Sequence, residues 1–357
     1  MPAAAIGYVN HHDIQPYCKT LTAFQYDRDY TVSSWGWPSF MNALTHAGQP
    51  LIRHFKLLLD PTYNRLTCPP NLPANIDPVR VAADYFRELH THIMTVMQAK
   101  FGDTVSNEDV LYVFTCPVWS DVAKNNLRKA AARAGFIPTA DIMSTRLVIA
   151  TEPEAAALWC TNNAAADVQM RNNETLLVID AGGGTVDLTV ERITSGPYGQ
   201  TLAEVAQASG NNCGATLVDD HFLAWLGEKV GKEAMEELQQ TRGTGYSSVL
   251  STWETLKRQF RGSTTDTYSF SLPAQLYNLI DDDHQNALEE AQDGMSDEVH
   301  ITAQDMLSFF DPVVNEILAL VGRQLDRCPG KTVDKAFVVG GFSASQYLVG
   351  RIRERFE

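Results

Sequence analysis

A glycine-rich turn near the middle of the chain constrains its fold more than any other feature. An apolar run at residues 175–179 ends in the sequence DAGGG at 180–184, and the alternating segment TVDLTV follows at 185–190. A glycine cluster between two such runs predicts a β-hairpin. Because glycine lacks Cβ, its backbone N–H groups can approach phosphate oxygens closely. Taken alone, the motif fits a purely structural hairpin as well as it fits a phosphate site.

Two helices are predicted before this hairpin. Apolar residues recur at steps of four over residues 79–99, which is the stripe of an amphipathic helix. The apolar run at 111–114 precedes a second helix over 120–134, with Ser120 as its N-cap and Gly135 as its C-terminal stop. Strand, turn and helix therefore follow one another in the first half of the chain.

The C-terminal part repeats this order. The apolar run at residues 336–339 leads into Gly340 and Gly341 and then into a predicted helix at 345–356. Strands that end in glycine turns at helix starts indicate an α/β fold with ligand contacts at the strand ends. The acidic stretch at 281–298 is predicted to be a solvated loop or helix face without a function of its own.

Bulk composition restricts the classes of partner. The chain has 357 residues, 44% of them hydrophobic, which is enough for two packed units. Its formal net charge of -15 repels phosphate backbones and anionic lipid surfaces, so neither nucleic acid nor a membrane is an expected partner. A nucleotide can still bind, because backbone N–H groups and a metal ion act locally against the overall field.

The same composition predicts a cytoplasmic protein. Its first residues lack a basic segment followed by an apolar core, and no apolar run reaches the roughly 18 residues of a membrane-spanning helix. The six cysteines form no CxxC pair and have no zinc-like spacing to histidine, so they are predicted to be buried thiols in a reducing compartment.

Two common phosphate motifs do not fit the hairpin. The dinucleotide fingerprint G-x-G-x-x-G fails because Asp187 stands three residues after Gly184, and no G-x-x-x-x-G-K-[ST] motif occurs in the chain. Dehydrogenase and P-loop interpretations are therefore weak. The remaining pattern is an acid, three glycines, a hydroxyl residue and a second acid within one hairpin.

Five segments, read in chain order, resemble the ATP-binding domain of the 70-kilodalton heat-shock chaperones, which belong to the actin-like ATPase superfamily. They are TCPVW at 115–119 with AGF at 134–136, TEPEAAA at 151–157, the hairpin at 178–190, ETLKR at 254–258, and VVGG at 338–341. The local sequence around Trp119, Trp253 and Phe342 is more similar to the divergent heat-shock-protein-12 type than to the housekeeping chaperones.

The resemblance implies a two-lobed α/β fold of the actin-like, ribonuclease-H-like kind. Residues 1–170 are expected to form the first lobe, and residues 171–357 the second, with the glycine hairpin, the adenosine helix and the C-terminal glycine turn. The family's first phosphate loop, D-x-G-T-T-x-S, has no counterpart in residues 1–20. The first lobe is therefore expected to be incomplete, and the domain truncated at both ends.

The resemblance also assigns catalytic roles. Asp180 and Glu152 are expected to order water around Mg²⁺, which prefers to keep several waters of its own. The Thr185 hydroxyl is expected to touch the γ-phosphate, and Asp187 to orient the attacking water. Lys56 stands where the family has its catalytic lysine, and the alternative of an ordinary surface lysine stays open.

Further residues are expected to bind the nucleotide itself. Glu254, Lys257 and Arg258 lie at i, i+3 and i+4, so a helix puts them on one face, either as an adenosine site or as a surface salt-bridge group. The other expected contacts are glycine backbones. They are Gly182, Gly183 and Gly184 at the β- and γ-phosphates, Gly340 and Gly341 at the α-phosphate or ribose, and Gly210 and Gly214 in a more weakly matching turn.

Phe342 replaces a small polar residue of the family, which removes a polar contact expected from its turn. The function implied is an ATP-binding domain that takes ATP or ADP with Mg²⁺ between two lobes and hydrolyses ATP slowly. Two alternatives stay open. One is an inactive nucleotide-binding or protein-interaction scaffold with protein partners, and the other is a small-molecule kinase of the same superfamily.

Overall fold

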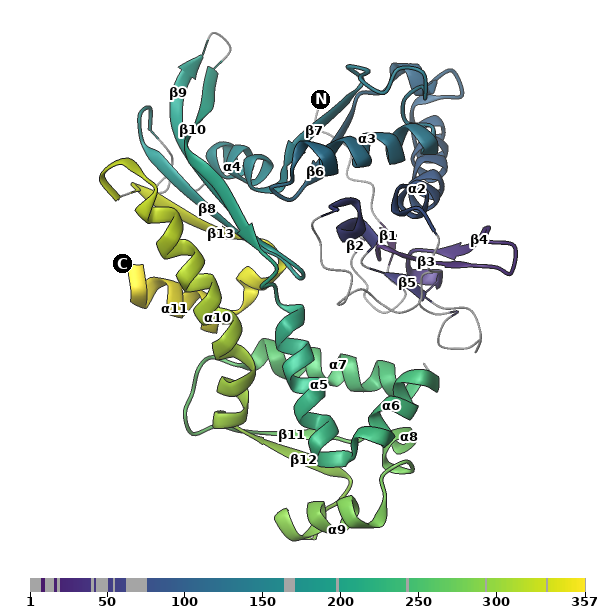
Figure 1. Cartoon of the computed structure of the whole chain (residues 1–357), viewed down its shortest axis with the longest axis vertical. Helices are drawn as coiled ribbons and strands as arrows, with labels where there is room; N and C mark the ends of the chain where they lie inside the picture. The colour runs from purple at the N-terminus through teal and green to yellow at the C-terminus, as the bar shows by residue number, and fades with distance from the viewer. Residues whose placement is uncertain are drawn as a thin grey trace. The chain divides into compact units, whose positions relative to one another are not determined.

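The computed structural model describes residues 8–9, 16–17, 20–39, 42, 51–53, 55–61, 76–163, 171–196, 199–241, 244–292, 294–331 and 333–356. The chain divides into two compact units, Met1–Ile149 and Ala150–Glu357, and each contains both helices and strands (Figure 1). The sequence placed the division after residue 170, which is later than the division between these units.

The first unit contains small sheets and two long helices. Its elements are β1 (Tyr8–Val9), β2 (Pro16–Tyr17), β3 (Ala23–Tyr26), β4 (Val32–Trp35), β5 (Leu51–Arg53), η1 (Phe55–Leu59), α2 (Pro78–Phe101), η3 (Asn107–Asp109), β6 (Tyr112–Cys116), α3 (Asp121–Ala134) and β7 (Leu147–Thr151). Strands β4, β3 and β5 form an antiparallel sheet in that order, and β6 lies next to β7.

Both helices predicted for this unit are confirmed. The Ser120 side chain accepts a hydrogen bond from the Ala123 backbone N–H and begins α3, and Gly135 ends it in a left-handed conformation with φ of 98°. Helix α2 begins after Asp77, whose carboxylate caps its first turn. The Phe55 ring packs beside Tyr85 of α2 at a centroid distance of 5.2 Å, which anchors the helix to the core.

The second unit is larger. Its elements are α4 (Glu152–Asn163), β8 (Thr175–Ala181), β9 (Val186–Gly196), β10 (Gly199–Asn211), α5 (Thr216–Val230), α6 (Lys232–Thr241), α7 (Thr244–Gln259), β11 (Thr267–Ser271), α8 (Ala274–Tyr277), α9 (Asp282–Ala291), β12 (Glu298–Thr302), α10 (Ala303–Asp326), η4 (Pro329–Lys331), β13 (Lys335–Val339), η5 (Gly341–Ala344) and α11 (Gln346–Phe356). The hairpin predicted from the glycine motif is confirmed as β8 and β9.

A four-stranded sheet of order β10-β9-β8-β13 organises this unit, antiparallel except for the parallel pair β13 and β8. Leu176 and Val178 of β8 pack with Ala157 of α4, while Leu177 and Ile179 belong to the core shared with α5 and α10. Burial on both faces explains why β8 is a continuous apolar run rather than an alternating one. It also explains why α4 belongs to the second unit.

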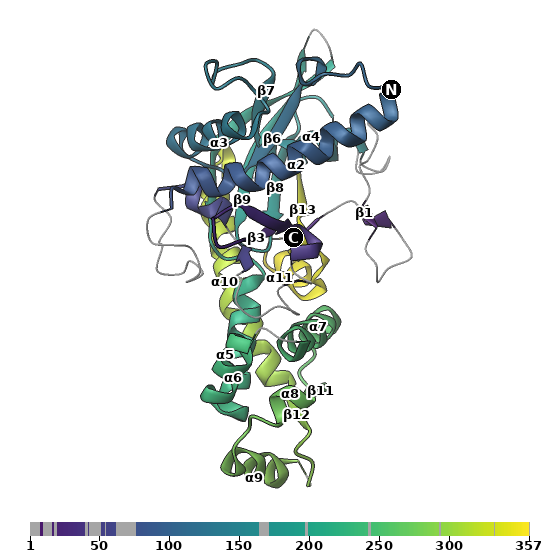
Figure 2. The same ribbon diagram turned by 90° about the vertical axis from the view of Figure 1, so that its right-hand side faces the viewer.

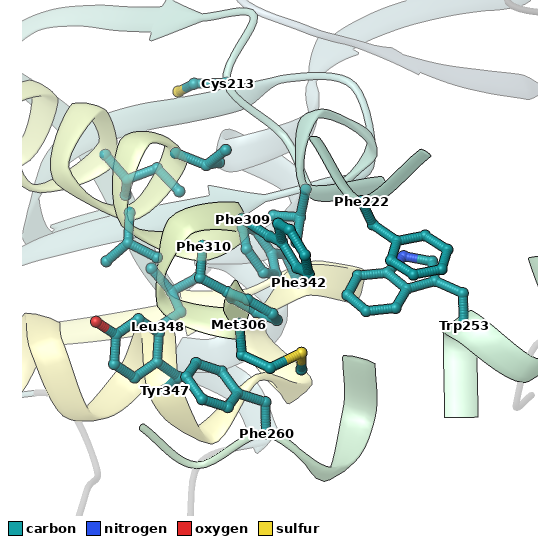
Figure 3. Close-up of a cluster of buried hydrophobic side chains, with 14 of the residues drawn as sticks. Cys213, Phe222, Trp253, Phe260, Met306, Phe309, Phe310, Phe342, Tyr347 and Leu348 are labelled. Atoms are coloured by element: carbon teal, nitrogen blue, oxygen red, sulfur yellow. The ribbon is translucent and has the colours of Figure 1, made fainter. Parts of the chain in front are cut away.

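Helix α10 joins the sheet to a mostly helical region. It packs against β9 and β10 near one end and against α5 and β12 elsewhere (Figure 1 and Figure 2). The centre of the helical region is a face-to-face pair of rings, Phe222 of α5 and Trp253 of α7, with centroids 4.0 Å apart and an interplanar angle of 3° (Figure 3). This stack holds α5 and α7 together.

Smaller predictions can also be compared with the structure. The acidic segment contains α9, whose first-turn side chains are solvent-exposed, as predicted. Cys116, Cys213 and Cys328 are buried free thiols, whereas the side chains of the other three cysteines lie outside the described residues. Within the described part of the chain, no helix combines the length and the apolar character needed to cross a bilayer.

The Phe222–Trp253 stack should carry a large share of the stability of the second unit. Replacing Phe222 by Ala removes a fully buried ring and leaves a cavity, so we expect a loss of about 3–5 kcal/mol in the free energy of unfolding. Urea denaturation followed by circular dichroism measures it. The matched control is Met295→Ala, at a side chain 42% exposed, and equal losses in the two variants would contradict this account.

Candidate functional site

A cavity of about 250 Å³ lies in the second unit, between the glycine hairpin, α5, α7 and η5. Its lining is Gly183, Ala215, Thr216, Asp219, Glu254, Lys257, Arg258, Phe310, Gly341, Phe342, Ala344 and Ser345. Five of these residues, Gly183, Glu254, Lys257, Arg258 and Gly341, are among the predicted nucleotide contacts, and they come from three separate motifs. The fold therefore brings the hairpin, the ETLKR helix and the C-terminal glycine turn to one place.

The hairpin turn leaves two amides unused. The Gly182 N–H donates to the Thr185 carbonyl at 2.9 Å and so closes the turn itself. The N–H groups of Gly183 and Gly184 donate to no group among the residues described. Three amides of the hairpin were expected to bind phosphate. Those of Gly183 and Gly184 can still donate to an anion, whereas the Gly182 amide already donates within the turn.

The carbonyl groups of the same turn accept hydrogen bonds from residues 214–216, at the start of α5. The backbone N–H groups of Ala215, Thr216 and Gly214 donate to the carbonyls of Gly182, Gly183 and Gly184, at 3.1, 2.9 and 3.3 Å respectively. The three carbonyl oxygens therefore face this segment. These hydrogen bonds fix the orientation of the peptide planes. They therefore also fix the direction of the N–H groups of Gly183 and Gly184.

Two glycines of the weakly matching turn permit this contact. A Cβ at Gly214 would lie 2.3 Å from the Gly183 carbonyl oxygen, and a Cβ at Gly210 would lie 2.5 Å from Oδ1 of Asp187. Real Cβ atoms do not come so close to other heavy atoms. Both positions therefore require glycine because backbone or carboxylate lies directly above them, and Asp187 is only 4% exposed as a result.

The C-terminal turn closes over the end of β8 in the same way. Val339 of β13 pairs with Asp180, and Gly340 follows with φ of 86°. A Cβ at Gly340 would lie 2.4 Å from the Ala181 carbonyl oxygen and 2.5 Å from Oδ1 of Asp180. Gly341 has no such neighbour within 4 Å and lines the cavity.

The charged side of the cavity comes from α7. Oε1 of Glu254 accepts a hydrogen bond from Nε of Arg258 at 2.7 Å, and its Oε2 lies 2.6 Å from Nζ of Lys257. The residues form the salt bridges of one alternative raised by the sequence and also line the cavity, while the adenosine site stays a prediction. Burial raises the pKa of Glu254, but hydrogen bonds from Lys257 and Arg258 outweigh it and hold the pKa below its usual value. Glu254 is accordingly ionised at neutral pH.

The sequence analysis missed Asp219, a third charged residue of this group. Its Oδ1 accepts hydrogen bonds from Nζ of Lys257 and Nε1 of Trp253, both at 2.7 Å. Asp219 lies in the first turn of α5, five residues after Gly214, and no motif marks it. Only the stacking of α5 on α7 brings it to Lys257.

The apolar floor of the cavity includes Phe310, which the sequence analysis missed. Phe310 of α10 and Phe342 of η5 are buried, with ring centroids 6.4 Å apart (Figure 3). Phe342 thus belongs to the core of the second unit, and the polar residue expected at its position is replaced by an aromatic surface. An apolar floor beside a charged rim is the usual construction of a small-molecule site.

The remaining predicted residues lie outside the cavity lining. Asp180, Thr185 and Asp187 belong to the hairpin, and Glu152 begins α4 in the second unit. Lys56 lies in η1 of the first unit, with Nζ 5.8 Å from the centroid of the Trp119 ring. Within the described ranges, no three His, Cys, Asp or Glu side chains are grouped to hold a metal by themselves.

Comparison with known proteins supplies a family and relatives. The family described as a domain of unknown function (DUF8340) matches residues 169–357, which is more than half of the chain. Heat shock 70 kDa protein 12A of Homo sapiens is 24% identical over 334 residues, covering 77% of this chain and 48% of the relative. Heat shock 70 kDa protein 12B of Homo sapiens is 25% identical over 330 residues, covering 75% and 47%.

A bacterial relative matches a shorter region. Chaperone protein DnaK of Thermus thermophilus is 35% identical over 144 residues, which is 40% of this chain and 20% of the relative. The chain spans about half the length of the two human relatives. The likeness to the divergent type 12 proteins, expected from the residue motifs, is confirmed.

The neighbouring glycines 340 and 341 offer a direct test of the turn geometry. Gly340→Ala should destabilise the chain by at least about 2 kcal/mol, because alanine is strained at positive φ and its Cβ would overlap Asp180 and Ala181. Gly341→Ala is the matched control and should change the free energy of unfolding by less than about 1 kcal/mol. Thermal and urea unfolding measure both, and equal effects would show that the turn is not packed as described.

Proposed function

Because this chain belongs to the family described as a domain of unknown function (DUF8340) and is a divergent relative of the 70-kilodalton heat-shock proteins, we propose that it is an ATP-binding domain of the actin-like ATPase fold. One observation carries the proposal. A single cavity joins a glycine turn with unused backbone N–H groups to an apolar floor with a charged rim. A nucleotide has the matching parts, namely phosphates, base and sugar.

The phosphates bind at the hairpin in this proposal. The N–H groups of Gly183 and Gly184 donate to no described residue. The carbonyls of Gly182, Gly183 and Gly184 accept hydrogen bonds from residues 214–216. Hydrogen bonds from fixed backbone amides to a phosphate are charge-assisted and cost little reorganisation. The Thr185 hydroxyl adds a donor to the γ-phosphate, and Gly341 lets the backbone approach the α-phosphate.

The nucleoside binds against α7 and η5. Phe310 and Phe342 supply an apolar surface for the base, and Arg258, whose side chain is 72% exposed, can lie over the base as a planar cation. Glu254 and Lys257 line the same cavity with groups that hydrogen-bond to hydroxyls. The base is therefore held mostly by apolar contact and stacking.

Mg²⁺ fits the carboxylates at the strand ends. Asp180 is the penultimate residue of β8, and Glu152 begins α4, which packs against the same sheet. Mg²⁺ is usually bound by one or two carboxylates plus substrate phosphates and waters, so two acids without a complete protein cage suit it. The ion would neutralise phosphate charge. Asp187 is proposed to orient the attacking water, and Lys56 stays a predicted catalytic lysine.

The proposal also includes the compartment and the partners of the protein. Three of the cysteines are buried free thiols, which fits a reducing compartment. We therefore place the protein in the cytoplasm, with a nucleotide as its ligand and other proteins as its partners.

Calorimetric titration of the chain with ATP and Mg²⁺ tests the proposal. Gly183→Val should weaken ATP binding at least about tenfold, because its side chain blocks the approach of phosphate to two amides. Folding should be unaffected, because a Cβ at Gly183 meets only the Thr216 methyl group, at 4.0 Å. Asp180→Ala should remove the part of the affinity that depends on Mg²⁺.

Two controls sharpen the result. Gly322→Val adds the same side chain to α10 where a Cβ would meet nothing within 4 Å, and it should bind ATP like the wild type. Adenosine lacks phosphates, so its affinity should be equal in wild type and Gly183→Val. A folded chain that binds no ATP at millimolar concentration, or a Gly183→Val variant with unchanged affinity, would sink the proposal.

A further inference from the structure

Two open grooves adjoin along α11 of the second unit. The first, of about 560 Å³, lies between α11, the beginning of α10 and the loop that follows α7. The second, of about 510 Å³, lies between α11 and η5. Gln346 and Gly350 of α11 line both grooves, so the grooves meet at these two residues. The first groove shares no lining residue with the cavity proposed for the nucleotide.

The absence of a side chain at Gly350 keeps the junction of the grooves open. Gly350 is exposed and lies in the interior of α11, where a glycine destabilises a helix relative to alanine. Packing does not require this glycine, because a Cβ at its position would meet nothing within 4 Å. The backbone does not require it either, since Gly350 is not among the glycines of positive φ. What the glycine provides is an uncovered helix surface.

The wall of the first groove is rigid. Gly262 has φ of 86°, and a Cβ there would lie 2.6 Å from Cδ2 of Tyr347, so the loop after α7 runs directly over the Tyr347 ring. The Tyr347 hydroxyl donates a hydrogen bond to Asp311 of α10. Nη1 of Arg351 donates to the same carboxylate at 3.0 Å, and its Nη2 donates to Oδ1 of Asn315 at 2.9 Å. These contacts hold the loop, α10 and α11 together before a partner arrives.

The rim of the grooves is basic, although the whole chain has a net charge of -15. Helix α11 carries three arginines and one glutamate, and Arg353 is one of the residues that line the second groove. Arg261 lines the first groove, is exposed and forms no ion pair with a described residue. Arginines in the last turn of a helix interact favourably with its dipole, but Arg261 lies outside α11. The grooves therefore favour an anionic occupant.

The lining restricts the class of this anionic occupant. Leu307 in the first groove and Val349 in the second are half-buried apolar residues, which a bare phosphate would leave uncovered. The exposed Gln346 amide can both donate to and accept from a peptide backbone. Nucleic acid and anionic lipid surfaces are repelled by the net charge of the chain. An extended polypeptide with acidic and apolar side chains matches the grooves best.

We propose that the two grooves form a docking site for an acidic, extended segment of a protein partner. The segment crosses α11 at Gly350, where its backbone can approach the helix closely. Its carboxylates lie beside Arg261 and Arg353, and its apolar side chains lie against Leu307 and Val349. The inference goes beyond the proposed function, because none of these residues is assigned to the nucleotide.

Fluorescence polarisation of a fluorescein-labelled peptide of alternating glutamate and leucine tests the proposal. Wild type should bind this peptide, and added salt should weaken the binding, because exposed charges are screened. A peptide with glutamine in place of glutamate should bind at least about tenfold more weakly. Excess ATP should not displace the peptide, because the first groove lies outside the cavity proposed for the nucleotide.

Gly350→Leu is the decisive variant. Leucine favours a helix more than glycine does, so the fold should be kept, as circular dichroism can check. The new side chain fills the junction of the grooves and should weaken peptide binding at least about tenfold. Gly322→Leu is the matched control, because Gly322 is also an interior helix glycine with nothing within 4 Å of a Cβ but does not line either groove. It should bind the peptide like the wild type.

The role of charge has its own pair of variants. Arg261→Gln removes the exposed cation of the first groove and should weaken peptide binding about threefold or more. Arg192→Gln removes an exposed arginine of β9, outside both grooves, and should leave the affinity unchanged.

Other results would overturn the inference. A wild type that does not bind the peptide, or a Gly350→Leu variant that binds it as tightly as the wild type, would show that the grooves are not a docking site. Displacement of the peptide by ATP would place it in the nucleotide cavity instead. Self-association of the chain that Gly350→Leu abolishes, measured by analytical ultracentrifugation, would assign the grooves to a second copy. Gly350→Leu should bind ATP like the wild type, so this inference and the proposed function can fail separately.

Discussion

Close backbone packing between the glycine hairpin and the segment before α5 is the constraint on which the rest of the site depends. Three amides of residues 214–216 bind three successive carbonyls of the hairpin, and Gly214 comes so near that no side chain fits between the two segments. A peptide plane whose carbonyl is fixed has its N–H group fixed as well. The same contact therefore positions the start of α5 and directs the N–H groups of the turn.

The start of α5 in turn determines the charged rim. Asp219 lies in the first turn of that helix, and Phe222 follows it on the way to the core. The stack of Phe222 on Trp253 sets the distance between α5 and α7, and the indole N–H of Trp253 binds Asp219 directly. The hairpin turn and the charged rim of the cavity are thus linked through one helix. A shift of the hairpin would therefore move the start of α5 and, through Asp219, change the position of Lys257.

Local signals in the sequence were sufficient for much of the fold. Ser120 and Gly135 mark the ends of α3 because capping depends on neighbouring residues alone. The glycine motif likewise predicts the β8–β9 hairpin, since turn chemistry is local. The position of α4 in the second unit was not evident, because it follows from Ala157 packing on strands that begin some twenty residues later.

Of the residues that line the cavity, the sequence singled out only those that belong to motifs. Gly183, Glu254 and Gly341 were found and lie together, but Asp219 and Phe310 reach the cavity only through the packing of α5, α7 and α10. The hydrogen bond from the Gly182 amide to the Thr185 carbonyl could not be predicted from the sequence either, since it depends on the path of the backbone. Tertiary contacts between distant segments leave no periodicity in a single sequence.

The most direct measurement of the central claim is nuclear magnetic resonance of the chain with isotope-labelled glycines, titrated with ATP and with adenosine. The account predicts that the amide signals of Gly183 and Gly184 shift strongly with ATP and weakly with adenosine, while the committed amide of Gly182 moves less. Signals of Gly183 and Gly184 that stay unchanged at saturating ATP would contradict the claim that the hairpin binds phosphate.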